Sequence, residues 1–137
     1  MKVNELYKKQ GFVVSKRVLT KEEVKSSSIS LKIFCKSYKA KEKRSINFAN
    51  KNNVNSIHDM EKWLWIKKIR QKKFFKKIIK DLIEENPKNF GSEYFAKPAK
   101  YGLPSPMHQD NFYWCLNNGK GLTAWIALDN ASKLNGG

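Results

Sequence analysis

The hydrophobic period of this 137-residue chain changes at Asn86-Pro87, and that change constrains its fold more than any other feature. Upstream, from Asp59, apolar residues recur at three- and four-residue spacing with lysines between them, which is typical of an amphipathic helix packed on a sheet. Downstream, short apolar runs of the kind found in strands stand between loops rich in Pro and Gly. A helix-rich first part (1–90) followed by a strand-rich second part (91–137) predicts an α+β domain.

Local signals predict the remaining elements. We expect a helix over 3–10 that Gly11 ends, a strand over Phe12–Val14 and Val18-Leu19, and a helix that starts at Thr20. Thr20 and Glu23 have the spacing of a capping box, and the helix should run into the thirties. Residues 36–55 are polar and rich in Asn and Lys, so we expect mostly loop. After Pro87 we expect strands at 93–97, through the His-Gln-Asp segment and at 122–128, with a turn at 117–121.

Length and composition indicate one globular domain with a core of its own. No apolar run approaches the roughly 18 residues of a membrane span, and the first ten residues lack the apolar stretch of a signal peptide. Cys35 and Cys115 are too few and too far apart for a disulfide framework or a zinc knuckle. We therefore expect a cytoplasmic protein with two reduced, structural cysteines.

The formal net charge of +16 belongs to the first part of the chain, because 25 of the 28 Lys and Arg residues lie at or before Lys97. A basic surface can bind nucleic acid or anionic lipid. The excess is almost entirely Lys, whereas phosphate recognition favours the planar fork of Arg. We interpret the charge as solvated helix faces and do not expect nucleic acid as a partner.

His108 and Asp110 are the candidate metal ligands. Two residues apart on an extended segment, they would project from the same face, so an imidazole and a carboxylate would converge on one point. With one more histidine they would form the 2-His-1-carboxylate triad of non-haem Fe(II) oxygenases. The other histidine, His58, lies upstream in a polar stretch, and we do not expect it to be that ligand.

The order of several segments resembles the phytanoyl-CoA dioxygenase family. The resemblance covers essentially the whole chain, and its specific part runs from Tyr94 to Gly137. It is carried by Gly11-Phe12-Val13-Val14, Tyr94-Phe95-Ala96-Lys97-Pro98, Pro106-Met107-His108-Gln109-Asp110, Leu122-Thr123-Ala124-Trp125-Ile126-Ala127-Leu128-Asp129 and Asn135-Gly136-Gly137.

The resemblance implies a double-stranded β-helix, a jelly-roll or cupin-like barrel with flanking helices. It implies an Fe(II)- and 2-oxoglutarate-dependent dioxygenase that uses O2, releases succinate and CO2, and hydroxylates a small-molecule substrate. His108 and Asp110 would be the first two iron ligands. Trp125 would line the 2-oxoglutarate pocket, and Lys97 would face it. Asp110 matches the hydroxylase pattern of such enzymes, because the related halogenases carry a small residue there.

The sequence departs from the family pattern at its C-terminal end. In the family a second histidine lies downstream, followed by an Arg that pairs with the distal carboxylate of 2-oxoglutarate, and this sequence reaches Gly137 before either. We therefore expect 1–137 to be a single partial oxygenase domain, the N-terminal portion of a longer protein, inactive as it stands. With two of three ligands it should bind Fe(II) weakly, and without the Arg it should bind 2-oxoglutarate poorly.

Two other functions remain open. A family member that has lost its chemistry could serve as a binding or interaction protein. A basic module could bind nucleic acid or an anionic surface, in which case its lysines should form one face and its affinity should fall steeply with salt.

Overall fold

The computed structural model describes residues 2–16, 18–37, 46–51, 53–83, 86–117 and 120–137. Five α-helices are present in this part of the chain: α1 (Val3–Gln10), α2 (Lys21–Ser37), α3 (Leu64–Gln71), α4 (Lys73–Ile83) and α5 (Asn111–Trp114). Three strands accompany them: β1 (Ile46–Asn50), β2 (Asn53–Ile57) and β3 (Tyr94–Phe95). Two short 3-10 helices are η2 (Met60–Lys62) and η4 (Lys133–Asn135). The α+β class predicted from the sequence is thus confirmed.

The sheet is small and antiparallel, in the order β1-β2-β3. β1 and β2 form a hairpin in which Ile46 faces Ile57, with irregular register on either side of Phe48. β3 pairs Tyr94 with Ile57, and the amide of Ala96 extends that pairing by donating to the Asn55 carbonyl at 2.8 Å. β2 is therefore the central strand, and it ends with the buried pair Ser56 and Ile57.

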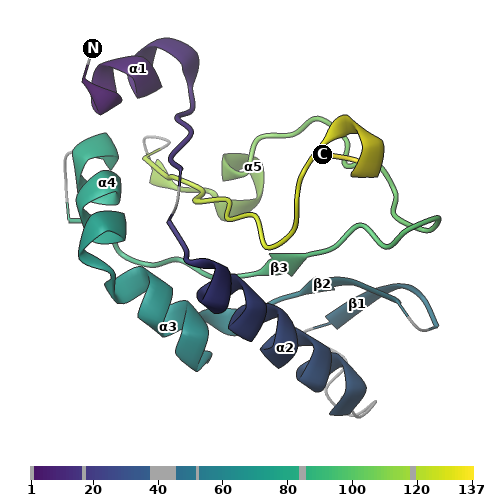
Figure 1. Ribbon diagram of the computed structural model, residues 1–137. Coiled ribbons are helices and arrows are strands. Elements are labelled where there is room, and N and C mark those ends of the chain that lie inside the picture. The colour runs from purple at the N-terminus through teal and green to yellow at the C-terminus, as the bar shows by residue number, and fades with distance from the viewer. Residues whose placement is uncertain (1, 17, 38–45, 52, 84–85, 118–119) are drawn as a thin grey trace.

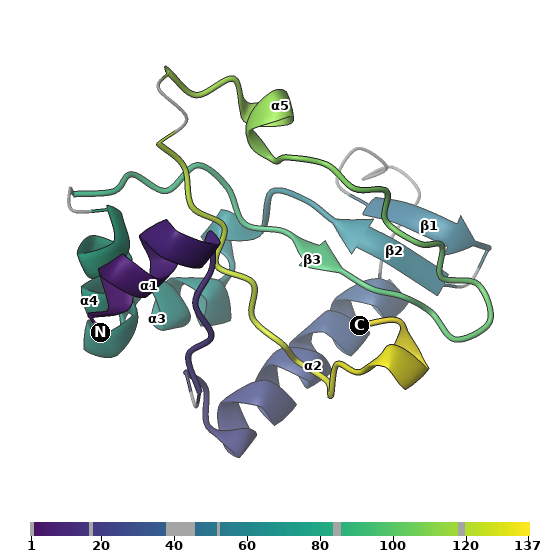
Figure 2. The same ribbon diagram turned by 90° about the horizontal axis from the view of Figure 1, so that it is seen from above.

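The core lies between the sheet and the helices α2 and α3. Leu31, Ile46, Ile57 and Met60 form its buried centre, and Leu128 from the C-terminal segment packs against it. α2 and α5 lie on opposite sides of the strands in both views (Figures 1 and 2). α1 packs against α4 at the edge of the molecule, and none of the described residues beyond Leu82 is buried. The residues of the His-Gln-Asp segment thus lie outside the core.

The helical predictions are confirmed with one correction. α1 ends at Gly11, which adopts φ 81°, a left-handed conformation that glycine takes without strain. α2 begins after Thr20 with both capping-box hydrogen bonds in place, Thr20 N to Glu23 Oε2 at 2.8 Å and Glu23 N to Thr20 Oγ1 at 3.2 Å. The apolar pattern from Asp59 is not one helix: it is divided into η2, α3 and α4, because Lys72 is extended (φ −59°, ψ 129°) between α3 and α4.

Several strand predictions are wrong. Within 36–55, which we expected to be mostly loop, residues 46–50 and 53–55 are strand, while 38–45 lie outside the described residues. The described residues of 12–19 form no strand, and Phe12 and Val14 are exposed. Neither the His-Gln-Asp segment nor 122–128 is a strand, and 118–119 of the predicted turn are not described. Of the predicted strand 93–97, only Tyr94–Phe95 is one.

These errors have a common physical reason. A strand forms when its backbone amides and carbonyls find a neighbouring strand, and an apolar pattern alone does not supply one. Asp110 instead adopts a helical backbone (φ −56°, ψ −34°) and leads into α5. Accordingly, the described residues form one three-stranded sheet, and the expected double-stranded β-helix is not seen among them.

Cys35 and Cys115 are free thiols in this structure. Cys35 packs against the core, and burial raises the pKa of its thiol. Cys115 is exposed and follows α5 in a left-handed conformation. Over the part of the chain that is described, none of the helices has the length and apolarity needed to cross a membrane.

Candidate metal centre

His108 and Asp110 lie together on the surface of the molecule. Nε2 of His108 is 3.3 Å from Oδ1 of Asp110, and the two side chains are 43% and 39% exposed. The segment that carries them is not a strand, so the geometry expected from their spacing does not explain their proximity. They meet where the irregular segment turns at Asp110, whose backbone is helical, into α5.

The backbone orients the imidazole. Nδ1 of His108 lies 2.8 Å from the carbonyl oxygen of Pro106. A carbonyl only accepts hydrogen bonds, so Nδ1 carries the hydrogen, and in the neutral ring the lone pair is on Nε2. This is the arrangement commonly found in metal-binding histidines, in which one nitrogen is fixed by a protein acceptor and the other faces the ion.

A hydroxyl orients the carboxylate. Oγ1 of Thr123 donates a hydrogen bond to Oδ2 of Asp110, the oxygen that does not face His108. The sequence analysis missed this contact, since Thr123 is thirteen residues away and no motif links the two positions. Tyr113 also contacts the centre, with its ring 6.0 Å from the imidazole in an edge-on arrangement.

The two donor atoms fit adjacent positions around one divalent ion. Donors roughly 2.1 Å from an octahedral metal and at right angles to each other stand about 3 Å apart, close to the observed 3.3 Å. The facial triad of non-haem iron enzymes has this geometry between each pair of ligands. However, no group of three or more His, Cys, Asp or Glu side chains that could hold a metal is found among the described residues. The centre therefore supplies two protein donors.

Trp125 and Lys97, the two predicted co-substrate residues, have different surroundings. Trp125 is two residues beyond Thr123 and is 71% exposed, so its ring is free to form one wall of a site. Lys97 instead donates from Nζ to the carbonyl of Gly136 at 2.6 Å. Gly136 has φ 82°, and a side chain there would lie 3.1 Å from Cδ of Lys97. In this structure Lys97 holds the C-terminal turn.

His58 has a different environment. Its Nδ1 lies 3.0 Å from Oε1 of Glu93, and its Nε2 lies 3.0 Å from Oγ of Ser56 and 3.0 Å from Nδ2 of Asn47. The order Ser-His-Glu resembles a nucleophilic triad, but Ser56 is 2% exposed and a substrate could not reach its hydroxyl. The cluster instead ties β1, β2 and the residue before β3 together.

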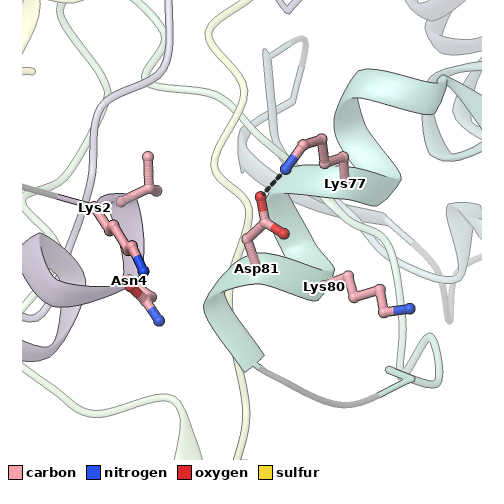
Figure 3. A pocket seen from close by; sticks show the side chains of 6 residues that line it. Lys2, Asn4, Lys77, Lys80 and Asp81 are labelled. Atoms are coloured by element: carbon pink, nitrogen blue, oxygen red, sulfur yellow. Dashed lines mark hydrogen bonds and ion pairs between the residues drawn. The ribbon is translucent and has the colours of Figure 1, made fainter.

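A hollow of about 530 Å³ lies between α1 and α4. It is lined by Lys2, Val3, Asn4, Lys77, Lys80 and Asp81 (Figure 3). Nζ of Lys77 pairs with Oδ2 of Asp81 at 2.5 Å, and in Figure 3 Lys80 points away from α1. The lysines of this hollow therefore do not converge on one anion.

Comparison with known proteins gives one match. The family described as Phytanoyl-CoA dioxygenase (PhyH) matches residues 7–137, nearly the whole chain. Neither the curated proteins nor the solved structures contain a match.

Proposed function

Because the chain belongs to the phytanoyl-CoA dioxygenase family, we propose that it is an Fe(II)- and 2-oxoglutarate-dependent dioxygenase in which His108 and Asp110 are two of the iron ligands. The family suggests an oxygenase-type function. The observation that carries the finer proposal is the 3.3 Å separation of His108 Nε2 and Asp110 Oδ1, which suits two adjacent ligands of one ion.

The metal would supply the activation of O2 with 2-oxoglutarate as electron donor, while the protein binds and orients. Pro106 holds the hydrogen of His108 on Nδ1, so Nε2 presents a lone pair. Asp110 adds a negative charge that suits a hard divalent cation. Two protein donors leave coordination positions open for a chelating keto acid and for O2.

For 2-oxoglutarate we propose Trp125 as a wall of the pocket and Lys97 as a residue that faces it. The exposed indole of Trp125 lies on the same segment as Thr123, which bonds Asp110. The ammonium of Lys97 uses one of its three donors on the Gly136 carbonyl and has two left for a carboxylate. The small-molecule substrate would be bound by other residues.

At the level of the domain, we propose one oxygenase domain of the family's cupin-like fold, with a double-stranded β-helix and flanking helices. Residues 1–90 are its helix-rich part, and 91–137 carry the ligands. The segment 122–128 has no regular secondary structure; Leu122, Ile126 and Leu128 are half-buried, Thr123, Ala124 and Trp125 are exposed, and Leu128 packs against the core. The sheet and α2 provide that core.

The basic-module alternative has less support. Exposed lysines do lie along α3 and α4, but Lys72, between the two helices, pairs with Glu23, and Lys77 pairs with Asp81. Such local neutralisation is typical of a solvated surface and not of a face built for phosphates. A family member without catalysis would instead show iron binding with no succinate formation.

The test is Fe(II) binding under anaerobic conditions, followed by succinate release from 2-oxoglutarate after O2 is added. We expect the 137-residue chain to bind Fe(II) weakly, since the described residues assemble two donors, and to release at most traces of succinate from 2-oxoglutarate. His108→Ala and Asp110→Ala should each abolish the binding.

His58→Ala is the matched control, because it removes the chain's other histidine from a site whose role is structural. We expect it to leave iron affinity unchanged. Iron affinity that is equal in His108→Ala, Asp110→Ala and the unaltered protein would contradict the proposal.

A further inference from the structure

Asp110 uses its two carboxylate oxygens differently. Oδ1 faces Nε2 of His108 at 3.3 Å. Oδ2 accepts the hydrogen bond from Oγ1 of Thr123. The Thr123 hydroxyl thus binds Oδ2 and leaves Oδ1 facing Nε2 of His108, so that one metal ion could bind both atoms.

This division matters because an aspartate carboxylate rotates easily. Its terminal torsion is broad and roughly two-fold, so a half-exposed Asp110 without a partner would sample many orientations. A donor fixed to Oδ2 selects one plane and favours single-oxygen ligation through Oδ1. Partners behind metal ligands orient them in this way.

We propose that Thr123 is the positioning residue for Asp110, so that the hydroxyl of Thr123 preorganises the carboxylate for a divalent metal beside His108. The proposal rests on the proposed function, because it takes His108 and Asp110 as the metal ligands. Thr123 is not a catalytic residue in this scheme, since it acts through Asp110 alone.

The same bond joins two segments of the site. Thr123 belongs to the segment that carries Trp125, while Asp110 is the N-cap residue immediately before α5. The side chain of Leu116 and the ring of Trp114 fill the space beside Gly121, where a Cβ would lie 2.8 Å from Leu116 Cδ1. This packing lies two residues before Thr123, on the segment from which its hydroxyl reaches Asp110.

The test uses Co(II), a redox-stable probe with absorption bands that report its ligand geometry, added to the full 137-residue chain. Thr123→Val keeps the shape of the side chain and removes the hydroxyl. We expect it to weaken Co(II) binding by about 10- to 100-fold, the usual effect of losing a partner behind a metal ligand. Thr123→Ser restores the hydroxyl and should recover most of the affinity and the absorption spectrum.

Thr20→Val is the matched control, because it removes a hydroxyl that bonds Glu23 N at the start of α2. It should lower the melting temperature and leave Co(II) affinity unchanged. A second readout needs no metal: the ¹³C carboxyl resonance of Asp110 should move in Thr123→Val and return in Thr123→Ser.

The outcomes separate the two proposals. If the unaltered chain binds Co(II) and Thr123→Val binds it equally well, or if the Asp110 resonance does not move, the role of Thr123 is overturned while the metal site stands. If Co(II) binding in the unaltered chain is absent or survives Asp110→Ala, the proposed function is overturned and the positioning role falls with it.

Discussion

The two histidines show how surroundings decide the role of a side chain. Both ring nitrogens of His58 have protein partners, Glu93 on one side and Ser56 with Asn47 on the other. His108 has a backbone carbonyl on Nδ1 and faces only an exposed carboxylate with Nε2. A metal could reach Nε2 of His108 without breaking a buried hydrogen bond. At His58 it would have to displace the hydrogen bonds to Ser56 and Asn47 in the sheet.

Substituting the two histidines should therefore affect different properties: stability at His58 and metal binding at His108. His58→Ala should reduce the free energy of unfolding by about 1–3 kcal/mol, because the buried hydroxyl of Ser56 loses its acceptor. His108→Ala, at an exposed position, should change stability little while it removes metal binding. Urea unfolding of both variants measures the difference. A His108→Ala variant less stable than His58→Ala would contradict this assignment.

At the scale of elements, Glu23 at the start of α2 takes part both in a local capping box and in a contact with Lys72, which is distant in sequence. The capping box of Thr20 and Glu23 could be predicted from sequence, because both partners lie within one helical turn. The same Glu23 oxygen also accepts from Nζ of Lys72 at 2.6 Å, and Lys72 donates to the Val18 carbonyl at 3.2 Å. The break between α3 and α4 thus presents Lys72 to α2, which no local pattern could reveal.

This contact predicts a pH dependence of stability. The hydrogen bond from Lys72, and next the one from the Thr20 amide, lower the pKa of the Glu23 carboxyl below its usual 4.5. A lowered folded-state pKa means that the stabilisation is present above the unfolded pKa and is lost as pH falls through the folded one. Melting temperatures from neutral to acidic pH should therefore fall less in Glu23→Gln than in the unaltered chain.

Lys72→Met tests the same contact from the other side. It should lower the melting temperature at neutral pH and flatten the acidic decline as Glu23→Gln does, because the carboxylate then loses its main partner. An acidic decline in Glu23→Gln that matches the unaltered protein would show that Glu23 does not titrate with folding.

The limits of sequence reasoning lie in pairing across the chain. β1 and β2 were missed because Asn47, Asn50 and Asn53 give the hairpin the composition of a loop, although Ile46 and Ile57 are buried within it. The proximity of His108 and Asp110 could be predicted from spacing, but the reason given, a strand, was wrong. Thr123 could not be predicted at all, since its bond depends on how two irregular segments meet.

The positive charge and the buried core both belong to the first part of the chain, whereas large apolar side chains are exposed in both parts of the described chain. All buried side chains of the described residues lie at or before Leu82, in the part that also carries most of the lysines. The later part exposes large apolar side chains, and Leu103, Met107, Phe112 and Leu134 are among them. Exposed apolar surface promotes association, whereas a net charge of +16 opposes it by repulsion.

Salt should therefore decide which of these two effects governs the association of the chain. The screening length falls to about 10 Å at 0.1 M salt, so repulsion between copies weakens while apolar attraction remains. We expect dynamic light scattering to show particle size rising with NaCl.

Leu103→Ser with Met107→Ser should suppress that rise, because both side chains are more than three-quarters exposed in the later part. Val14→Ser, at an equally exposed apolar position between α1 and α2, should suppress it less, because Val14 lies in the lysine-rich part, where repulsion between copies opposes contact. A particle size that falls as salt is added would instead show that association is electrostatic and that the lysines, not the apolar surface, drive it.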